Sequence, residues 1–443
     1  MRPGPAGYLM RTMTYPPGQA VADSGSGVQG AEAVSVVMPV RNEERHLEEA
    51  VRSVLGQDYP GEVEVVLAVG PSRDRTLQIS ESLAAADPRV TVVPNPSGAI
   101  PCAVNAAIKA SRHSVVARVD GHALLPPGYL RRAVRALEQT GAANVGGIMA
   151  AQGVTPFQQA VAWAMTSRFG VGAAKFHTGG RPGAVDSVYL GVYRRAAIDQ
   201  AGGYDESYQR AEDWELNHRI RLSGGLIWFL PELQVCYRPR ASVRTLAEQY
   251  FSYGRWRRVV VRQHPGTVSP RYLAPPVAVL AIVAGALAGL TGLAGLAAAG
   301  FAVPAAYLAG TLGAALRAAR LLRPPVAALV PLVLATMHVC WGIGFLTSPR
   351  SLMPDSGPGG RPPALLARLP AGRGQPAAAA RALTMPRPSM MVAVIRRTQA
   401  IGMCSRLLAA TLTATAATVH RPSVAPASTS SGSYLAARFA AVS

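Results

Sequence analysis

The sequence predicts an α/β domain with a doubly wound sheet, followed by a C-terminal transmembrane helical segment. Between residues 33 and 119, short runs of apolar, β-branched residues alternate with stretches that suit helices, which is typical of parallel α/β sheets. Residues 272–316 then form 45 consecutive positions without a charged side chain, and residues 324–349 form 26 more. A membrane-spanning helix needs roughly 20 apolar residues, so these stretches accommodate two helices and one helix.

Four strands and three connecting helices are expected at the start of the α/β domain. Asn42 is expected to cap the first helix, because its side chain can accept a hydrogen bond from a free amide of the first turn. Glu43 and Glu44 then suit the positive end of the helix dipole. Ligands are expected at the edge where the parallel strands end. The expected strands are residues 34–39, 63–69, 90–93 and 114–119, and the expected helices are residues 42–55, 73–85 and 100–110.

Composition divides the chain into four parts. Residues 1–31, rich in Gly, Pro and Ser, are expected to form a flexible arm, and residues 32–265 the α/β domain. Residues 272–349 are expected to contain about three transmembrane helices; the alternative is a helical hairpin buried in a soluble core, which is seldom this long and uncharged. Residues 350–443, mostly Ala, Pro, Ser, Thr and Arg, are expected to be a low-complexity, disordered tail or an out-of-frame extension.

The net charge of +20 is distributed unevenly. Residues 1–271 carry 30 basic and 23 acidic side chains, whereas residues 351–443 carry ten arginines and one acid. Because most of the excess lies outside the acid-containing half, no nucleic-acid partner is expected. Arginines precede the first expected membrane span (within 255–271) and follow the second (within 317–323), and the positive-inside rule places both groups in the cytoplasm. We therefore expect a multi-pass protein of the plasma membrane with a cytoplasmic α/β domain.

Several common enzyme motifs are absent from the sequence. There is no GxxxxGK[ST] phosphate loop, no GxGxxG after a strand, no HExxH and no GxSxG. ATPase, dinucleotide-dependent dehydrogenase, zinc protease and serine hydrolase functions therefore lack motif support. The four cysteines are not spaced as metal ligands, which argues against a disulfide framework or a Cys-based zinc site.

Three short segments with acidic residues are candidates for a catalytic or binding role. Asp120 and His122 follow an expected strand and can both reach one divalent ion; the alternative is an Asp-Gly turn. Glu212 and Asp213 begin a helix expected over residues 212–222. An acid at this position can act as a general base, or it can simply be stabilised by the positive end of the helix dipole. Asp186 precedes an apolar run and is either a ligand contact at a strand end or a loop acid.

Aromatic and basic residues are interleaved just before the first apolar stretch. Arg255 suits a phosphate, and Trp256 suits stacking on a sugar. An interfacial belt at the membrane surface explains the same residues.

Together these features resemble the family-2 inverting glycosyltransferases, which have the GT-A fold. Residues 36–44 resemble the family's first nucleotide-binding strand and turn, and residues 53–57 and 72–76 its next elements. The resemblance covers residues 33–348. Residues 186–195, 202–206 and 338–345 also resemble one branch of the family, the exopolysaccharide branch typified by the succinoglycan-type membrane glucosyltransferases.

Two motifs of this family carry the chemistry. Asp120-Gly-His122 stands where the family has its Asp-x-Asp metal motif, and Glu212-Asp213 matches the pair whose Asp is the catalytic base. Gln249 to Trp256 resembles a spaced form of the Gln-x-x-Arg-Trp motif. Two departures are His122, in place of the second Asp, and Gly70, in place of the Asp that ends the second strand and contacts the nucleoside.

The resemblance implies a role for each matching residue. It implies a divalent metal cofactor, Mn²⁺ or Mg²⁺, on Asp120 and His122, and catalysis by Asp213 with Glu212. The donor-binding residues would be Pro39, Asn42, Glu43, Asp74, Asn105, Asp120 and Arg255, and the acceptor-binding residues Asp186, Trp214, Gln249 and Trp256.

The expected function is sugar transfer from a nucleotide-diphospho-sugar donor to a lipid-linked or polysaccharide acceptor, in exopolysaccharide or cell-envelope glycan synthesis, with possible polysaccharide-assembly partners. One alternative is a polyprenyl-phosphate sugar transferase or a processive polysaccharide synthase. Another, of a different class, is a non-catalytic basic membrane scaffold.

Overall fold

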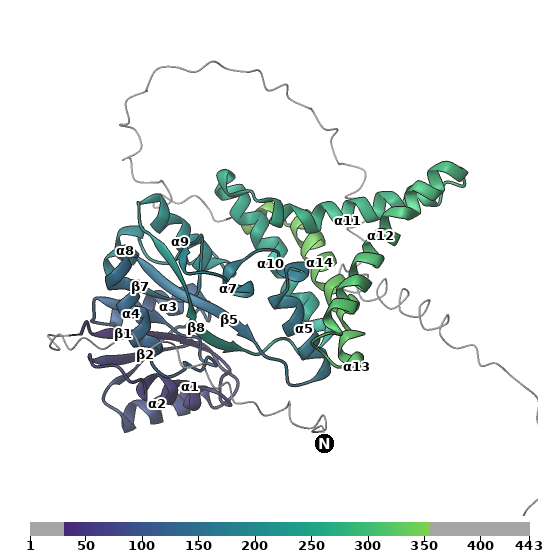
Figure 1. The fold of residues 1–443 in the computed structure, drawn as a ribbon. Coiled ribbons are helices and arrows are strands. Elements are labelled where there is room, and N and C mark those ends of the chain that lie inside the picture. The colour runs from purple at the N-terminus through teal and green to yellow at the C-terminus, as the bar shows by residue number, and fades with distance from the viewer. Residues whose placement is uncertain (1–30, 354–443) are drawn as a thin grey trace, which may run out of the picture. The chain divides into compact units, whose positions relative to one another are not determined.

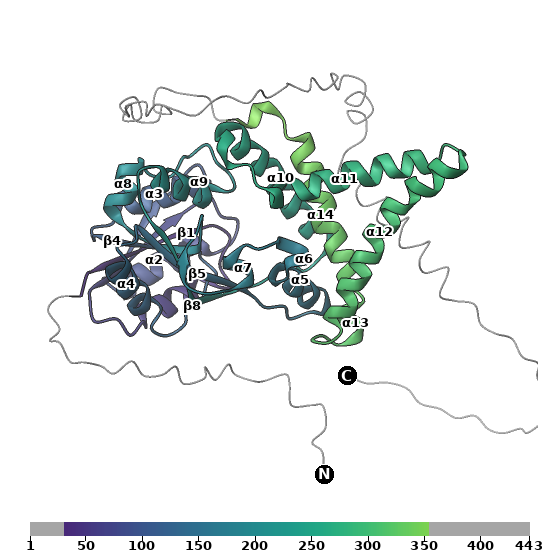
Figure 2. The ribbon, with the colours of Figure 1, turned by 45° about the horizontal axis from the view of Figure 1, so that its top comes forward.

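The computed structural model describes residues 31–353 of the chain as an α/β domain and a set of long helices (Figures 1 and 2). The predicted arm and the predicted tail, apart from residues 31 and 350–353, lie outside these described residues.

A single eight-stranded sheet organises the α/β domain, in the order β3-β2-β1-β4-β7-β5-β8-β6. The four predicted strands are confirmed to within one residue at each end, and they pair in parallel. The expectation of a parallel sheet fails beyond them, because β7 runs antiparallel to β4 and β5, and β6 runs antiparallel to β8. The strands are β1 (Val34–Val40), β2 (Val63–Val69), β3 (Val90–Pro94), β4 (Val115–Arg118), β5 (Asn144–Ala151), β6 (Gly183–Ala184), β7 (Tyr189–Arg194) and β8 (Ile227–Tyr237).

Strands β5 and β8, near the β6 edge of the sheet, pair in parallel with a break in register next to Gly147. A Cβ at Gly147 would lie 1.8 Å from the carbonyl oxygen of Leu233, so only glycine lets the two backbones approach here.

Helices cover both faces of the sheet, as the doubly wound arrangement requires. Alternate residues of β1 face opposite layers: Val36 and Met38 pack with the helices on one face, and Val37 packs with those on the other. The first layer contains α1 (Leu47–Leu55), α2 (Thr76–Ala86) and α4 (Tyr129–Thr140); the second contains α3 (Ile100–Ala110), α8 (Arg195–Ala201) and α9 (Glu212–Leu222).

The predicted N-cap of the first helix is wrong. Helix α1 begins at Leu47, and Asn42 has a φ of 57°, a left-handed conformation that asparagine tolerates better than most residues. Residues 41–46 form a loop instead, because the polar groups of Asn42 bond to the neighbouring loop and not to a helix. Short helices α5 (Pro156–Thr166), α6 (Arg168–Val171) and α7 (Lys175–Thr178) complete the domain.

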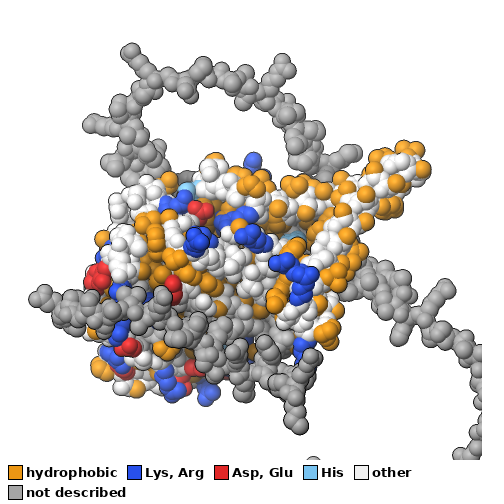
Figure 3. Space-filling view, viewed as in Figure 1, with side chains coloured by type: hydrophobic (Ala, Val, Ile, Leu, Met, Phe, Trp, Pro, Cys, Tyr) orange, Lys and Arg blue, Asp and Glu red, His pale blue; other side chains and the backbone are white. Residues whose placement is uncertain are grey.

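Three helices are long and apolar enough to cross a membrane: Pro270–Gly289, Ala294–Ala318 and Pro324–Thr347. They correspond to α11 (Pro270–Gly289), α12 (Ala294–Ala318) and the pair α13 (Pro324–Ala327) and α14 (Val330–Thr347). Apolar side chains cover the surface of α11 and α12 in Figure 3, and leucines such as Leu287 and Leu316 are largely exposed. An apolar surface of this extent is typical of contact with lipid.

Helix α10 (Val243–Gln263) joins the α/β domain to these helices. It packs against α14 with almost no side chain between the two backbones. A Cβ at Gly254 would lie 2.1 Å from the carbonyl oxygen of Trp341, and one at Gly344 would lie 2.1 Å from that of Phe251. Small residues allow helices to approach this closely, as they do in membrane bundles.

Candidate active site

The loops that follow β1 and β2 are bonded to each other. The backbone N–H of Asn42 donates to Ser72 Oγ (3.1 Å), and Asn42 Oδ1 accepts from the N–H of Arg73 (2.9 Å). Asp74 accepts from the hydroxyl of Thr76 (2.5 Å) and from the N–H of Glu44 (3.2 Å), and the Thr76 hydrogen bond lowers the pKa of Asp74. Asn42 and Asp74, both predicted to bind a donor, therefore also hold this edge of the sheet together.

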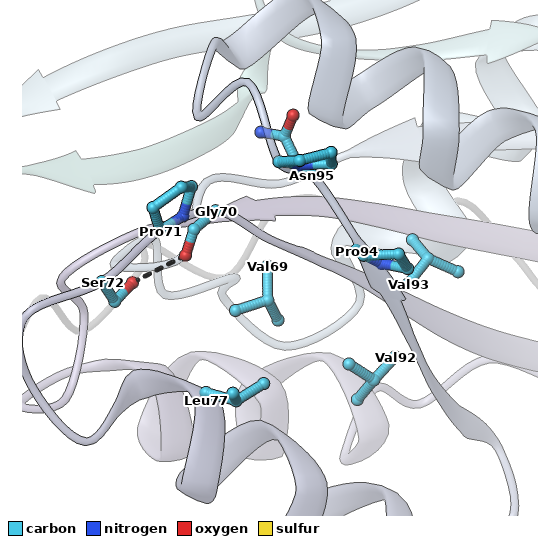
Figure 4. A pocket seen from close by; sticks show the side chains of 10 residues that line it. Val69, Gly70, Pro71, Ser72, Leu77, Val92, Val93, Pro94 and Asn95 are labelled. Carbon is cyan, nitrogen blue, oxygen red and sulfur yellow. Dashed lines mark hydrogen bonds between the residues drawn. The ribbon is translucent and has the colours of Figure 1, made fainter.

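A shallow cavity of about 430 Å³ lies where β2 and β3 end (Figure 4). Its lining is mostly apolar, and Figure 4 shows the Ser72 hydroxyl turned toward its own loop, where it donates to the carbonyl oxygen of Gly70 (3.0 Å). A Cβ at Gly70 would lie 3.3 Å from Gly98 Cα, so an acid at this position would crowd the next loop. The lining residues are Val69, Gly70, Pro71, Ser72, Leu77, Val92, Val93, Pro94, Asn95 and Pro96.

A buried arginine joins the two acidic motifs that the sequence singled out. Arg118, at the end of β4, is 5 % exposed and forms an ion pair with Asp213. Its Nη2 lies 3.2 Å from Glu212 Oε1 and 3.5 Å from Asp120 Oδ1. The structure therefore brings residues 120 and 212–213 to one place, although more than 90 positions separate them in the sequence.

Asp213 has the electrostatic properties of a general base. Its burial raises the pKa of Asp213 to about 6; Arg118 opposes this rise, and Glu212 and Asp120 add to it. Tyr204 Oη donates a hydrogen bond to Asp213 Oδ1 (3.1 Å) and fixes the direction of the carboxylate. A base with a pKa near 6 is unprotonated at neutral pH and still accepts a proton efficiently.

Asn105 positions Tyr204. Its Oδ1 accepts from the N–H of Tyr204 (2.9 Å), and its Nδ2 donates to the Tyr204 carbonyl (2.8 Å) and to Glu206 Oε1 (2.9 Å). Sequence reasoning missed both Tyr204 and Arg118. The signal for Arg118 was present, because an arginine inside a predicted buried strand requires acidic partners elsewhere in the fold. Tyr204 carries no such signal.

Asp120 and His122 are the predicted ligands of a divalent cation, and a second carboxylate holds the His122 ring. His122 Nδ1 lies 2.8 Å from Glu43 Oε1, and this hydrogen bond raises the pKa of His122. A carboxylate on one ring nitrogen of a metal-binding histidine orients the other nitrogen toward the ion. No group of three or more His, Cys, Asp or Glu side chains gathers as a ligand set in residues 31–353, so a bound ion would need further ligands from the substrate.

The predicted acceptor residues lie on three elements: the loop before β7, α9 and α10. Asp186 is about half exposed and pairs with Arg221 (3.1 Å). Trp214 is buried and stacks on His218, with ring centroids 5.2 Å apart, while Gln249 Nε2 donates to the hydroxyls of Tyr237 and Tyr253 (2.9 Å each).

Two further predicted residues lie on α10. Arg255 lies over the ring of Phe251, 5.6 Å from its centroid, and Trp256 is 5 % exposed and packs against Tyr208. Trp256 shares an apolar cluster with Trp214, the residue that follows Asp213. Neither Arg255 nor Trp256 forms an ion pair or a ring contact with Arg118 or the acids around it in the described residues, and their roles in binding stay predictions.

Two solved structures have low similarity to this chain. The mannosyltransferase PcManGT from Pyrobaculum calidifontis, in complex with GDP-Man and Mn²⁺, is 18 % identical, with a TM-score of 0.47 and coverage of 73 % of this chain and 91 % of that one. S. aureus TarS residues 1–349, in complex with UDP-GlcNAc, are 20 % identical, with a TM-score of 0.39 and coverage of 50 % of this chain and 65 % of that one.

Sequence comparison is more decisive. The family Glycosyl transferase family 2 matches residues 35–202. The chain is 32 % identical over 312 residues to the succinoglycan biosynthesis protein ExoA of Rhizobium meliloti (strain 1021), which covers 70 % of this chain and 93 % of that protein. It is also 31 % identical over 106 residues to the uncharacterized glycosyltransferase EpsJ of Bacillus subtilis (strain 168), over 24 % of this chain and 30 % of that protein. The chain thus belongs to glycosyltransferase family 2, as its motifs predicted.

Proposed function

We propose that the protein is a membrane-bound inverting glycosyltransferase that moves a sugar from a nucleotide-diphospho-sugar to a lipid-linked acceptor in exopolysaccharide synthesis. The observation that carries this proposal is the Arg118 cluster, which holds a candidate base and a candidate metal ligand at one edge of the sheet. The similarity to a succinoglycan biosynthesis protein supports the exopolysaccharide assignment.

The donor would lie along the carboxyl ends of β1, β2 and β4. The apolar cavity beside Gly70 suits a nucleobase. Pro39 lies near the end of β1, and Asn42 and Glu43 lie in the next loop, which is bonded to Ser72 and Thr76. Asp120 and His122 would hold a divalent cation, Mn²⁺ or Mg²⁺, which offsets the negative charge of the leaving diphosphate.

The acceptor would approach Asp213 from the side opposite the diphosphate. The Asp213 carboxylate takes the proton of the acceptor hydroxyl while that oxygen attacks the anomeric carbon, which inverts the configuration at that carbon. Arg118 and Tyr204 hold the carboxylate in place during the attack, so less reorganisation is needed in the transition state.

The membrane helices would keep a lipid-linked acceptor close to this base, which raises its effective concentration. The arginines on α10 and after α12 favour a cytoplasmic position for the α/β domain. In that arrangement the donor comes from the cytoplasm and the acceptor from the inner leaflet.

The test is sugar transfer by the full chain in membranes, with a panel of nucleotide-sugars and a lipid extract as acceptor. Asp213→Asn keeps the shape of the side chain but removes the base, and we expect turnover to fall roughly 10²- to 10⁴-fold. Asp199→Asn, on the exposed face of α8, is the matched control and should retain full activity. Undiminished turnover in Asp213→Asn would refute the assignment of the base.

A further inference from the structure

The arginines where α10 leads into α11 have almost no acidic partners. Arg262 donates to the carbonyl oxygens of Ser348 and Pro349. The ion pairs of residues 31–353 include none of the other four, which are Arg255, Arg257, Arg258 and Arg271. Figure 3 shows basic side chains gathered between the sheet and the apolar helices.

Arg257 is the most enclosed of these four side chains. Its Nε and Nη1 are buried and have no hydrogen-bond partner in the described chain. The guanidinium lies between two aromatic rings, 4.9 Å from the centroid of Trp214 and 4.1 Å from that of Tyr272. Aromatic faces stabilise a cation but accept no strong hydrogen bond from it, so the donors of Arg257 still lack an acceptor.

The position of this guanidinium indicates where its acceptor comes from. Trp214 follows the candidate base directly on α9, and Tyr272 lies in the first turn of α11, the first of the candidate membrane spans. Arg257 therefore lies between the helix that carries the base and the point where the chain meets the membrane. Arg118, at the carboxyl end of β4 where the donor diphosphate would bind, contacts Asp213 itself. Arg257 contacts the next residue, Trp214, and forms no ion pair with a carboxylate of residues 31–353.

A second arginine, Arg271, lies beside the same tyrosine as Arg257. Arg271 lies 4.6 Å from the centroid of the same Tyr272 ring. Two guanidinium groups can offer paired N–H donors to the oxygens of one phosphate, and a phosphate needs such donors when it leaves water. Tyr272 and Trp214 are also side chains that suit the level of lipid headgroups.

We propose that Arg257, together with Arg271, binds the phosphate of the lipid-linked acceptor at the membrane surface, between Trp214 and Tyr272. This inference rests on the proposed function and extends it, because it separates the phosphate of the acceptor from that of the donor. The phosphate then holds one end of the acceptor at the membrane surface, and the sugar at the other end of the acceptor extends toward Asp213.

The first experiment measures binding to the full chain in detergent micelles. Three probes are used: geranylgeranyl diphosphate, geranylgeraniol and inorganic pyrophosphate. In Arg257→Met we expect the affinity for geranylgeranyl diphosphate to fall about tenfold or more, with the affinity for geranylgeraniol unchanged. Arg257→Lys keeps the charge without the planar group and should lose less.

Arg258→Met is the matched control, because Arg258 is the next residue of α10 and also lies over an aromatic ring, that of Phe345. It should bind all three probes as the wild type does. Wild-type affinity of Arg257→Met for geranylgeranyl diphosphate would overturn the proposal. Equal wild-type affinity for pyrophosphate and geranylgeranyl diphosphate would also overturn it, since the site would then bind a free phosphoanion. A melting temperature confirms that each variant is folded.

The second experiment separates donor from acceptor in turnover. Arg257→Met should raise the KM for lipid acceptor and leave the KM for nucleotide-sugar unchanged. A raised KM for nucleotide-sugar alone would place Arg257 in the donor site and overturn the proposal. If the wild type transfers no sugar at all, the proposed function fails, while the binding experiment still decides the role of Arg257.

Discussion

Arg118 and Arg257 lie in very different electrostatic surroundings, although both guanidinium groups pack near aromatic rings. Arg118 lies 5.9 Å from the centroid of Tyr204 and faces three carboxylates of its own chain. Arg257 lies between Trp214 and Tyr272 and forms no ion pair with a carboxylate of residues 31–353, although Asp186 lies near enough to act on its charge. The chain neutralises Arg118 by itself, so that cluster is organised before any substrate arrives. Arg257 has no such partner in the described chain, and we propose that the phosphate of the acceptor supplies the negative charge.

The largest expected difference between the two arginines is in stability. Arg118→Met leaves three acids without their cation, and we expect the free energy of unfolding to fall by about 3–5 kcal/mol. Arg257→Met removes a cation without an acidic partner and should change stability far less. Thermal melting of both variants in detergent, followed by tryptophan fluorescence, measures the difference. Similar losses in the two variants would contradict the comparison.

The second prediction concerns the metal side of the Arg118 cluster. Glu43→Ala removes the carboxylate that orients His122, and we expect the Mn²⁺ concentration for half-maximal turnover to rise about 10- to 100-fold. Glu49→Ala, on the exposed face of α1, is the control. A chelator should abolish turnover in the wild type, and added Mn²⁺ should restore it. Turnover that persists in the chelator would exclude the metal role.

The third prediction follows from the raised pKa of Asp213. The base works as a carboxylate, so activity is retained above pH 6 and lost as pH falls through about 6. Below that value, kcat should fall about tenfold for each pH unit. A pH profile of single-turnover rates between pH 4.5 and 8 measures this. A flat profile over that range would show that no carboxylate of this kind limits the reaction.

The smallest expected effect is that of salt. The lipid phosphate would approach Arg257 from water, so salt screens this attraction, whereas the ion pairs of Arg118 form inside the chain and are screened less. The Debye length falls from about 10 Å to about 3 Å between 0.1 M and 1 M salt. We expect the KM for lipid acceptor to rise a few-fold over this range, while the melting temperature changes little. A large fall in melting temperature with an unchanged KM would reverse the roles of the two arginines.

The parts of the fold that depend on neighbouring residues were predictable from sequence. Helix α9 has the predicted bounds, and the uncharged stretches became the three long helices, because hydrophobic periodicity and the absence of charge are local properties. The position of β7 between β4 and β5 was not predictable, because pairing between distant strands leaves no local pattern.

In the candidate site, too, contacts between residues far apart in the sequence could not be predicted. Asp120 and Asp213 were identified singly by their motifs. The buried position of Arg118 indicated that it has acidic partners, but nothing local indicated which acids these are. Asn42 was assigned to a helix cap on the basis of its type and its acidic neighbours. The hydrogen bonds that it makes instead come from residues about 30 positions away, so the local interpretation failed there.

The crossing of α10 and α14 has a mechanical consequence. Because their backbones touch at Gly254 and Gly344, neither helix can roll or slide without moving the other. Helices α10, which carries Arg257, and α14 are therefore expected to move together as one rigid unit. If α14 crosses a membrane, a change in bilayer thickness that tilts α14 would also tilt α10, and the lipid environment would then alter the geometry around Arg257.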